Sequence, residues 1–214
     1  MTISALIAEV REDITDDVET TKRHSDTQMI RFANEAIKEA CIRSPLLVID
    51  KTFSVLVGTA EYTMDAYVRQ VINAKLSLNT YALQQSTKEE LAMWYGSNWK
   101  AKTGTPTHYL RTNRVIRLYP IPIVVDSMVL TQSRIPDTNF NIDTDIDQTY
   151  YDSIKWYIAY KCFSNRDADN FDPVKANEYM ARFDSQFGTK HSAKYDSVNY
   201  STPMYATAIS GRIC

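Results

Sequence analysis

Residues 104–122 read GTPTHYLRTNRVIRLYPIP and contain two short runs rich in β-branched and aromatic residues. Such runs are typical of β-strands, and the pair Thr112-Asn113 between them predicts a turn. Glycine admits a positive φ, whereas proline fixes its own φ and has no N–H for a strand ladder. We therefore expect a turn before the first run and an end to strand pairing after the second. These fold-defining residues are Gly104, Pro106, Pro120 and Pro122.

Runs of the same kind continue on both sides of this stretch, over residues 46–135. They read LLVID, TFSVLVG and YVRQVINAKLSL before it and DSMVLTQSRI after it. One helix interrupts them at residues 86–96, where Ser86 and Glu89 are expected to cap its start and Gly96 to end it. We predict an antiparallel sheet, sandwich-like or barrel-like, inserted between helices.

Amphipathic helices are predicted before this sheet. Apolar residues recur at three- and four-residue spacing from Ile3 to Val18, and a second helix begins at a capping box formed by Ser25 and Gln28. Pro45 closes the second helix, since the residue before a proline is pushed out of the helical region. Two amphipathic helices with a short link predict an antiparallel hairpin.

Two more helices are predicted after the sheet. Asp147 or Thr149 opens the first of them, and Asp172 caps the second, which has Pro173 at its first position and ends at Gly188. The fold class is therefore α+β, with a four-helix core built from both chain ends. The predicted domains are a helical hairpin over 1–45, the β insertion with one short helix over 46–135, a second helical hairpin over 136–194 and an extended C-terminal arm over 195–214.

The C-terminal segment after residue 194 has no helical or strand period, and Asp196 and Arg212 are its only charges. We interpret it as an extended arm that becomes ordered on a partner, and a terminus that stays unstructured is the alternative. Its spaced aromatic and aliphatic residues are Tyr195, Tyr200, Tyr205, Ile209 and Ile213.

Composition and motif content argue against several classes of protein. Hydrophobic residues make up 44% and charged residues 23% of the 214, as in ordinary globular proteins. No apolar run approaches the roughly 20 residues of a membrane span. The five glycines form no phosphate-binding loop, and the three cysteines, Cys41, Cys162 and Cys214, form no CxxC pair or disulfide framework. We expect no cofactor, no metal site and no enzymatic activity.

An acidic loop is predicted between residues 134 and 155, whose only charges are Asp137, Asp143, Asp145, Asp147 and Asp152. Its DxDxD spacing resembles the start of a calcium-binding EF-hand loop. However, Gln148 and Ile154 stand where that loop needs a glycine and a bidentate glutamate. We interpret the segment as a solvated loop whose last aspartate caps a helix. A carboxylate pair for hydrolysis of the cell wall is the alternative.

A basic segment lies within residues 91–125, where no Asp or Glu opposes Lys100, Lys102, Arg111, Arg114 and Arg117. Aromatic residues from Trp94 to Tyr119 are interleaved with them. This pattern favours half-buried sheet residues, and binding of single-stranded nucleic acid by stacking and phosphate neutralisation is the alternative. The basic segment of one copy could also contact the acidic loop of another, including Asp143 and Asp145, and close a ring. High salt or charge reversal at Arg114 and Arg117 should then dissociate that ring.

The order of these features resembles the head-to-tail adaptor (connector) proteins of tailed bacteriophages. GTPTHY at 104–109 and IRLYPIP at 116–122 carry the resemblance, which extends over residues 1–190. A tryptophan-bearing helix precedes these motifs, and an acidic linker, a Tyr-rich helix and an Asp-rich turn follow them. The resemblance implies a structural, non-enzymatic virion protein that is assembled in the host bacterial cytoplasm.

The resemblance also implies partners for the chain. Family members form a ring, commonly of twelve copies, that joins the portal ring to tail or nozzle proteins around a channel for double-stranded DNA. The helices are expected to build the ring, the β insertion to project toward the tail, and the C-terminal arm to extend along the portal. DNA should pass without specific binding, so we expect a neutral or acidic lumen, because lysine and arginine contacts would retain phosphate. Whether the basic segment lines the channel or faces a tail protein is left open.

Overall fold

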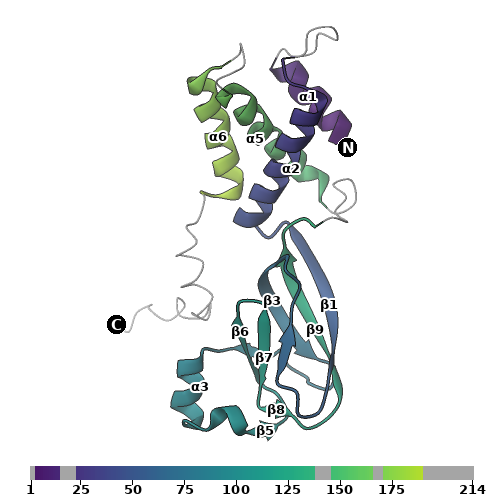
Figure 1. Cartoon of the computed structure of the whole chain (residues 1–214), viewed down its shortest axis with the longest axis vertical. Helices are drawn as coiled ribbons and strands as arrows, with labels where there is room; N and C mark the ends of the chain where they lie inside the picture. Colours follow the sequence, from purple (N-terminus) through teal and green to yellow (C-terminus); the bar gives the residue numbers. More distant parts are fainter. Residues whose placement is uncertain (1–2, 15–22, 138–145, 166–170, 190–214) are drawn as a thin grey trace, which may run out of the picture. The chain divides into compact units, whose positions relative to one another are not determined.

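The computed structural model of the chain describes residues 3–14, 23–137, 146–165 and 171–189, and it has the predicted α+β fold. The chain divides into two compact units (Figure 1). The helical unit takes its residues from 1–47 and 134–190, and the described residues of the β unit lie within 48–133. The β unit is thus an insertion between two helical segments.

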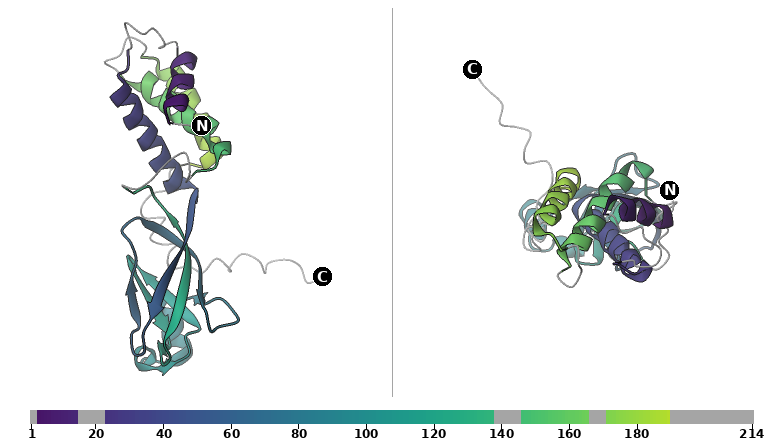
Figure 2. Two further views of the ribbon diagram at one scale, coloured as in Figure 1. Left: turned by 90° about the vertical axis from the view of Figure 1, so that its right-hand side faces the viewer. Right: turned by 90° about the horizontal axis from the view of Figure 1, so that it is seen from above.

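Within its described residues, the helical unit consists of α1 (Ile3–Asp13), α2 (Asp26–Arg43), α5 (Tyr151–Ser164) and α6 (Pro173–Phe187). Helix α5 contacts each of the other three, as can be followed in Figure 2. Apolar side chains from all four helices meet in one buried cluster, so the segments before and after the insertion share a core. Fully buried members include Leu6, Met29, Ile37, Ile154, Ile158 and Phe183.

The starts of α2 and α6 are formed by the residues that the sequence predicts. Ser25 Oγ accepts the backbone N–H of Gln28 at 3.2 Å, and Gln28 Oε1 accepts that of Ser25 at 3.1 Å. The Asp172 carboxylate accepts two backbone N–H groups of the first turn of α6. Both capping predictions are confirmed, and Gly188 ends α6 with a φ of 80°.

The start of α5 differs from the prediction. A 3₁₀ turn, η2 (Gln148–Tyr150), precedes it, and α5 itself begins at Tyr151 without a side-chain cap. The Asp147 carboxylate accepts the Thr149 backbone N–H at 2.9 Å. Asp147 therefore caps the 3₁₀ turn instead of α5, since the tighter turn uses its side chain before the α-helix begins.

The β unit contains short and long strands in three small sheets, as far as the structure describes it. The sheet orders are β1-β9-β3, β2-β7-β6-β4 and β5-β8. The strands are β1 (Leu47–Val55), β2 (Glu61–Thr63), β3 (Val68–Leu76), β4 (Gln84–Gln85), β5 (Thr103–Gly104), β6 (His108–Thr112), β7 (Val115–Tyr119), β8 (Ile121–Pro122) and β9 (Asp126–Arg134). Helix α3 (Lys88–Tyr95) and the 3₁₀ turn η1 (Trp99–Ala101) lie between β4 and β5 in the sequence.

Strand pairing departs from the predicted antiparallel sheet. Strand β7 is antiparallel to β6 and to β2, but β4 is parallel to β6 and β5 is parallel to β8. The parallel partners are two-residue strands, which are too short to leave a period in the sequence. Most of the two runs LLVID and TFSVLVG lies in one strand, β1, which ends at Val55. Lys51 lies in the middle of this strand, and its ammonium contacts the Asp65 carboxylate at 2.6 Å.

The cap of α3 lies one residue later than predicted. Thr87 Oγ1 accepts the Glu90 backbone N–H at 3.2 Å, and Glu90 Oε2 accepts that of Thr87 at 2.8 Å. The Ser86 backbone N–H instead donates to the carbonyl oxygen of Tyr109 on β6. Sheet pairing therefore holds Ser86 outside the helix. Gly96 ends α3 as predicted.

The positive φ expected at Gly104 is not found, although the chain bends at Thr105 before β6. Gly104 lies in β5, pairs with Pro122 and does not have a positive φ. The left-handed residue is Asn113, at φ 53° in the loop between β6 and β7. Pro122 does not end strand pairing either, because it lies in β8 and its carbonyl oxygen accepts the Gly58 N–H at 2.9 Å. Strand β7 ends at Tyr119, before Pro120, while Pro106 is buried near Asn79, whose amide donates to its carbonyl.

Candidate functional site

A cluster of aromatic rings lies where α3 and η1 meet the β6–β7 hairpin. The ring centroids of Tyr95 and Tyr119 are 4.9 Å apart, those of Trp99 and Tyr119 are 5.8 Å apart, and those of Trp94 and His108 are 6.0 Å apart. We call these five residues the aromatic platform. Trp99 and Tyr119 are buried with Leu91 and Leu110, whereas Trp94 is 48% exposed and Tyr95 is 37% exposed. The platform thus has a packed base and an exposed edge.

Three of the five predicted basic residues gather on this platform. Lys100 Nζ lies 5.8 Å from the Trp99 ring centroid, and Arg117 Cζ lies 5.5 Å from it. Lys102 Nζ lies 5.4 Å from the Tyr95 ring centroid. A cation within about 6 Å of an aromatic ring is attracted by its negative face. These contacts hold the cations on the protein surface in defined positions.

The remaining contacts separate engaged cations from available ones. Arg117 forms an ion pair with Glu61 at 2.7 Å and donates to the Lys100 carbonyl oxygen at 3.1 Å. Arg111 donates to the carbonyl oxygens of Val68 and Asn113. Arg114, in the β6–β7 loop, is exposed and has no side-chain hydrogen bond or ion pair within the described chain. Arg111 and Arg117 are therefore largely occupied inside the β unit.

The histidine of the platform has a perturbed pKa. Burial lowers the pKa of His108 below its usual 6.5, and the charge of Glu90 raises it by a smaller amount. Its Nδ1 atom lies 2.8 Å from the Thr107 hydroxyl. The platform is accordingly stable with a neutral imidazole near neutral pH.

A second surface of the β unit is apolar. The loop after β1 exposes Leu56 and Val57, and the segment between β8 and β9 exposes Ile123, Val124 and Val125, each by more than half. The Gly58 N–H donates to the Pro122 carbonyl oxygen, which joins the two loops. We call these five aliphatic residues the apolar tip. Exposed apolar groups gathered in this way are typical of an interaction surface.

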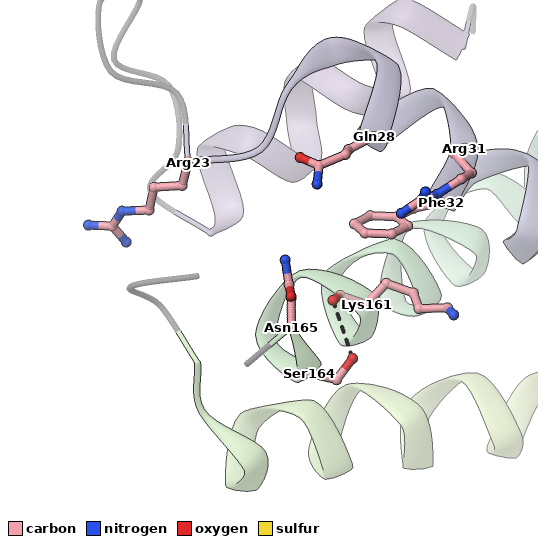
Figure 3. Close-up of a pocket in the computed structure, with 7 residues that line it drawn as sticks. All are labelled: Arg23, Gln28, Arg31, Phe32, Lys161, Ser164 and Asn165. Atoms are coloured by element: carbon pink, nitrogen blue, oxygen red, sulfur yellow. Dashed lines mark hydrogen bonds between the residues drawn. The ribbon is translucent and has the colours of Figure 1, made fainter. Parts of the chain in front are cut away.

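A third surface is a cationic pocket in the helical unit, at the start of α2 and the end of α5. The cavity measures about 480 Å³. Figure 3 shows Gln28 and Phe32 of α2 facing Asn165 and the end of α5 across it. Its lining residues are Arg23, Gln28, Arg31, Phe32, Lys161, Ser164 and Asn165.

The charge of the pocket is positive. Three of its lining residues are cations. Within the described residues, Glu35 is the carboxylate that pairs with two of them, at 2.8 Å from Lys161 Nζ and 3.9 Å from Arg31 Nε. The Arg31 side chain is 63% exposed. Burial lowers the pKa of Lys161, but the Glu35 hydrogen bond and nearby charges raise it by more, so its net pKa lies above the usual value. Lys161 is therefore charged at every physiological pH.

The described residues contain no group of three or more His, Cys, Asp and Glu side chains placed to hold a metal ion. None of the described helices is both long enough and apolar enough to span a membrane. Cys41 and Cys162 are buried in the core of the helical unit, as their helical positions predict, and neither forms a disulfide within the described residues.

A comparison with protein families adds a direct finding. The family model described as SU10 adaptor protein matches residues 1–206 of the 214-residue chain. This chain belongs to the SU10 adaptor protein family. The family is one of phage head-to-tail adaptors, so the resemblance found in the sequence is confirmed. No curated protein matches the chain.

Membership makes this chain a phage adaptor, that is, a structural component of a virion. Sequence reasoning found the basic residues of the adaptor but missed its apolar tip and its cationic pocket. The charge-free run from Leu118 to Val125 is the signal that could have indicated the tip. The pocket leaves no such signal, because residues 28 and 165 meet only in the folded helical unit.

Two sets of predicted residues in the adaptor lie outside the described part of the chain. The first is the pair Asp143 and Asp145 of the acidic loop. The second is the C-terminal arm with Tyr195, Tyr200, Tyr205, Ile209 and Ile213. Their predicted roles stay predictions.

Proposed function

We propose that this adaptor assembles as a ring, with twelve copies to match the portal, and joins the portal ring to the tail or nozzle proteins around the DNA channel. The observation that carries this proposal is the family match over residues 1–206. The fold supports it, because the four helices share one core and can act as a rigid ring subunit. The adaptor has no enzymatic role in this proposal and is assembled in the host cytoplasm.

The C-terminal arm is the proposed portal anchor. Residues 195–214 combine spaced tyrosines and isoleucines with very few charges. Tyrosine is enriched at protein interfaces, and an arm that orders on binding can cover a large surface. In this proposal, portal attachment resides in residues 195–214.

The β unit is the proposed contact with the tail. Its apolar tip exposes five aliphatic side chains, and its platform exposes Trp94 and Tyr95 beside Lys102. Removing such apolar surface from water favours association by about 25 cal/mol per Å². The tip would supply affinity, and the cations of the platform would orient the partner.

Double-stranded DNA is proposed to pass through the ring without specific binding. Arg111 and Arg117 support this, because carbonyl oxygens and Glu61 occupy their guanidinium groups. Fewer available cations mean fewer phosphate contacts and weaker retention of DNA.

One observation favours a second candidate function, the binding of single-stranded nucleic acid. Trp94 is half exposed, and Lys102 lies near the adjacent Tyr95 ring. An exposed ring next to a cation is the arrangement on which a base stacks while its phosphate is neutralised. The third possibility is a cell-wall hydrolase using Asp145 and Asp147 of the acidic loop, and of these two residues only Asp147 lies in the described part of the chain.

Sedimentation of the purified adaptor, alone and mixed with its cognate portal ring, tests the proposal. We expect it to join the portal at one copy per portal subunit, as matched symmetry requires. Deletion of residues 195–214 should abolish this binding, whereas Trp94→Ala, a matched control in the β unit, should leave it intact. A chain that ignores the portal and shows quenching of Trp94 fluorescence with single-stranded DNA would establish the second candidate instead.

A further inference from the structure

The acidic loop and the cationic pocket carry opposite charge on one chain. Between residues 134 and 155 every charged side chain is an aspartate. Asp147, directly before the 3₁₀ turn η2, is exposed. The pocket presents Arg23, Arg31 and Lys161 around its cavity. Opposite charges attract across an interface and fix its register. The chain therefore contains both halves of an electrostatic contact.

These two halves lie at opposite ends of α5. The Asp147 carboxylate is fixed on the 3₁₀ turn that precedes α5, by its hydrogen bond from Thr149. Lys161, Ser164 and Asn165 belong to the last turn and the C-cap. Ten residues separate Tyr151 from Lys161, which is roughly 15 Å at the rise of an α-helix.

The packing of α6 against α5 also shows that Asp147 and the pocket lie near opposite ends of α5. Phe163 stacks on Tyr179 in the first half of α6, at 5.7 Å between ring centroids. Tyr150, at the other end, lies 6.0 Å from Phe187 at the end of α6. The Asp147 carboxylate of one copy therefore cannot reach the pocket of the same copy.

We infer that the cationic pocket of one copy receives the acidic loop, Asp143 to Asp147, of the next copy. The contact joins two different surfaces, so it is heterologous and repeats from copy to copy until the ring closes. It rests on the proposed ring and names the residues that hold the ring together. Arg111 and Arg117 of the basic segment are less suited to this role, because their guanidinium groups are engaged within the β unit.

Charge reversal on the full-length chain tests this contact. Arg31→Glu changes an exposed side chain, so the fold should persist, and we expect self-association to weaken about tenfold, or ~1.4 kcal/mol. Asp145→Arg should weaken it similarly, and the two changes together should restore most of the loss. Arg182→Glu is the matched control, because Arg182 is also an exposed helical arginine with a glutamate one turn away, outside the pocket. Equal effects of Arg31→Glu and Arg182→Glu would overturn the inference.

Disulfide trapping gives a second readout that does not depend on affinity. In a Cys214→Ser background, chains carrying Arg31→Cys are mixed with chains carrying Asp145→Cys, with and without portal rings. We expect a cross-linked pair that the control mixture of Arg182→Cys with Asp145→Cys does not give. Absence of that pair under both conditions would refute the contact.

The competing occupant is the chain's own acidic segment, which includes Asp17 and lies next to Arg23 in the sequence. A chain with both Arg31→Cys and Asp17→Cys would then close a disulfide within the monomer, and this outcome would also overturn the inference. Failure of the proposed function is distinguishable, because it would appear as no binding of the wild-type chain to portal rings. The trapping of two copies without the portal is independent of that result.

Discussion

The helical unit and the β unit hold their cations in different ways. In the helical unit, the Arg43 side chain is 1% exposed and forms ion pairs with Glu39 of its own helix and Asp184 of α6. In the β unit, Lys100 and Lys102 are exposed and lie over aromatic rings. The first arrangement ties helices together, and the second keeps charge on the surface.

This difference separates stability from recognition. Burying a charged side chain removes its water, and this cost is offset only where oppositely charged partners are in place. Arg43 and its two carboxylate partners therefore matter mainly for the stability of the fold. A surface cation over a ring contributes little to stability and can still meet a partner. A single substitution of a cation should therefore mainly lower stability in the helical unit and mainly weaken binding in the β unit.

Arg43→Met should have the largest effect. It removes the buried guanidinium that pairs with Glu39 and Asp184. Because these carboxylates are 12% and 31% exposed, we expect a loss of about 3 kcal/mol, the lower end of the range for breaking a buried pair. Urea unfolding followed by far-ultraviolet circular dichroism measures the loss. Arg182→Met on the exposed face of α6 is the control and should stay within about 0.5 kcal/mol. Similar midpoints for the two variants would show that Arg43 does not tie α2 to α6.

Thr87→Ala, in the β unit, should cause the second-largest loss of stability. Loss of an N-cap side chain costs about 0.5–2 kcal/mol. Ser86→Ala is the neighbouring control, because the Ser86 hydroxyl is buried without a hydrogen bond and only its backbone is used. The order of the two urea midpoints decides which residue caps α3. A larger loss of stability for Ser86→Ala than for Thr87→Ala would show that Ser86, the residue predicted from the sequence, caps α3.

The pair Ser86 and Thr87 illustrates what the sequence can predict. Local chemistry correctly indicates a capped helix here, as it does at Ser25 and Asp172, because a cap needs only three neighbouring residues. Ser86 is held outside the helix by the hydrogen bond from its backbone N–H to the Tyr109 carbonyl oxygen, and Tyr109 is more than twenty residues away in the sequence. The parallel pairing of Gly104 with Pro122 was missed for the same reason, since two-residue strands form only in the presence of their partners.

The candidate surfaces follow the same rule. The basic segment could be found because its charges are adjacent in sequence, but only the fold distinguishes the engaged Arg117 from the available Arg114. The cationic pocket joins the start of α2 to the end of α5, and no local pattern connects them. Charge in a sequence therefore indicates a candidate interface, while the contacts in the fold decide which side chains are available to a partner.

Arg117→Met should have a smaller effect than either variant above. Its ion pair with Glu61 is partly exposed, and such pairs contribute about 0.2–1 kcal/mol. The methionine retains much of the packing on Trp99, so the variant reports mainly the charge. Arg114→Met is the control and should leave the urea midpoint unchanged. Added salt should reduce the difference between the two variants, because it screens exposed charges; a difference that persists at high salt would argue against an ionic origin.

The smallest effect should be a pH dependence confined to the β unit. Burial lowers the pKa of His108 in the folded state, so the unfolded chain binds a proton more readily. This contribution to stability is complete above pH 6.5, the ordinary histidine pKa, and is lost as the pH falls below it toward the folded-state pKa. We expect the melting temperature to drop between about pH 7.5 and about pH 5 by less in His108→Gln than in the wild-type chain. An equal drop in both chains would mean that the aromatic platform accommodates a protonated His108 without loss of stability. The contrast between an uncharged aromatic platform in the β unit and buried ion pairs in the helical unit would then fail.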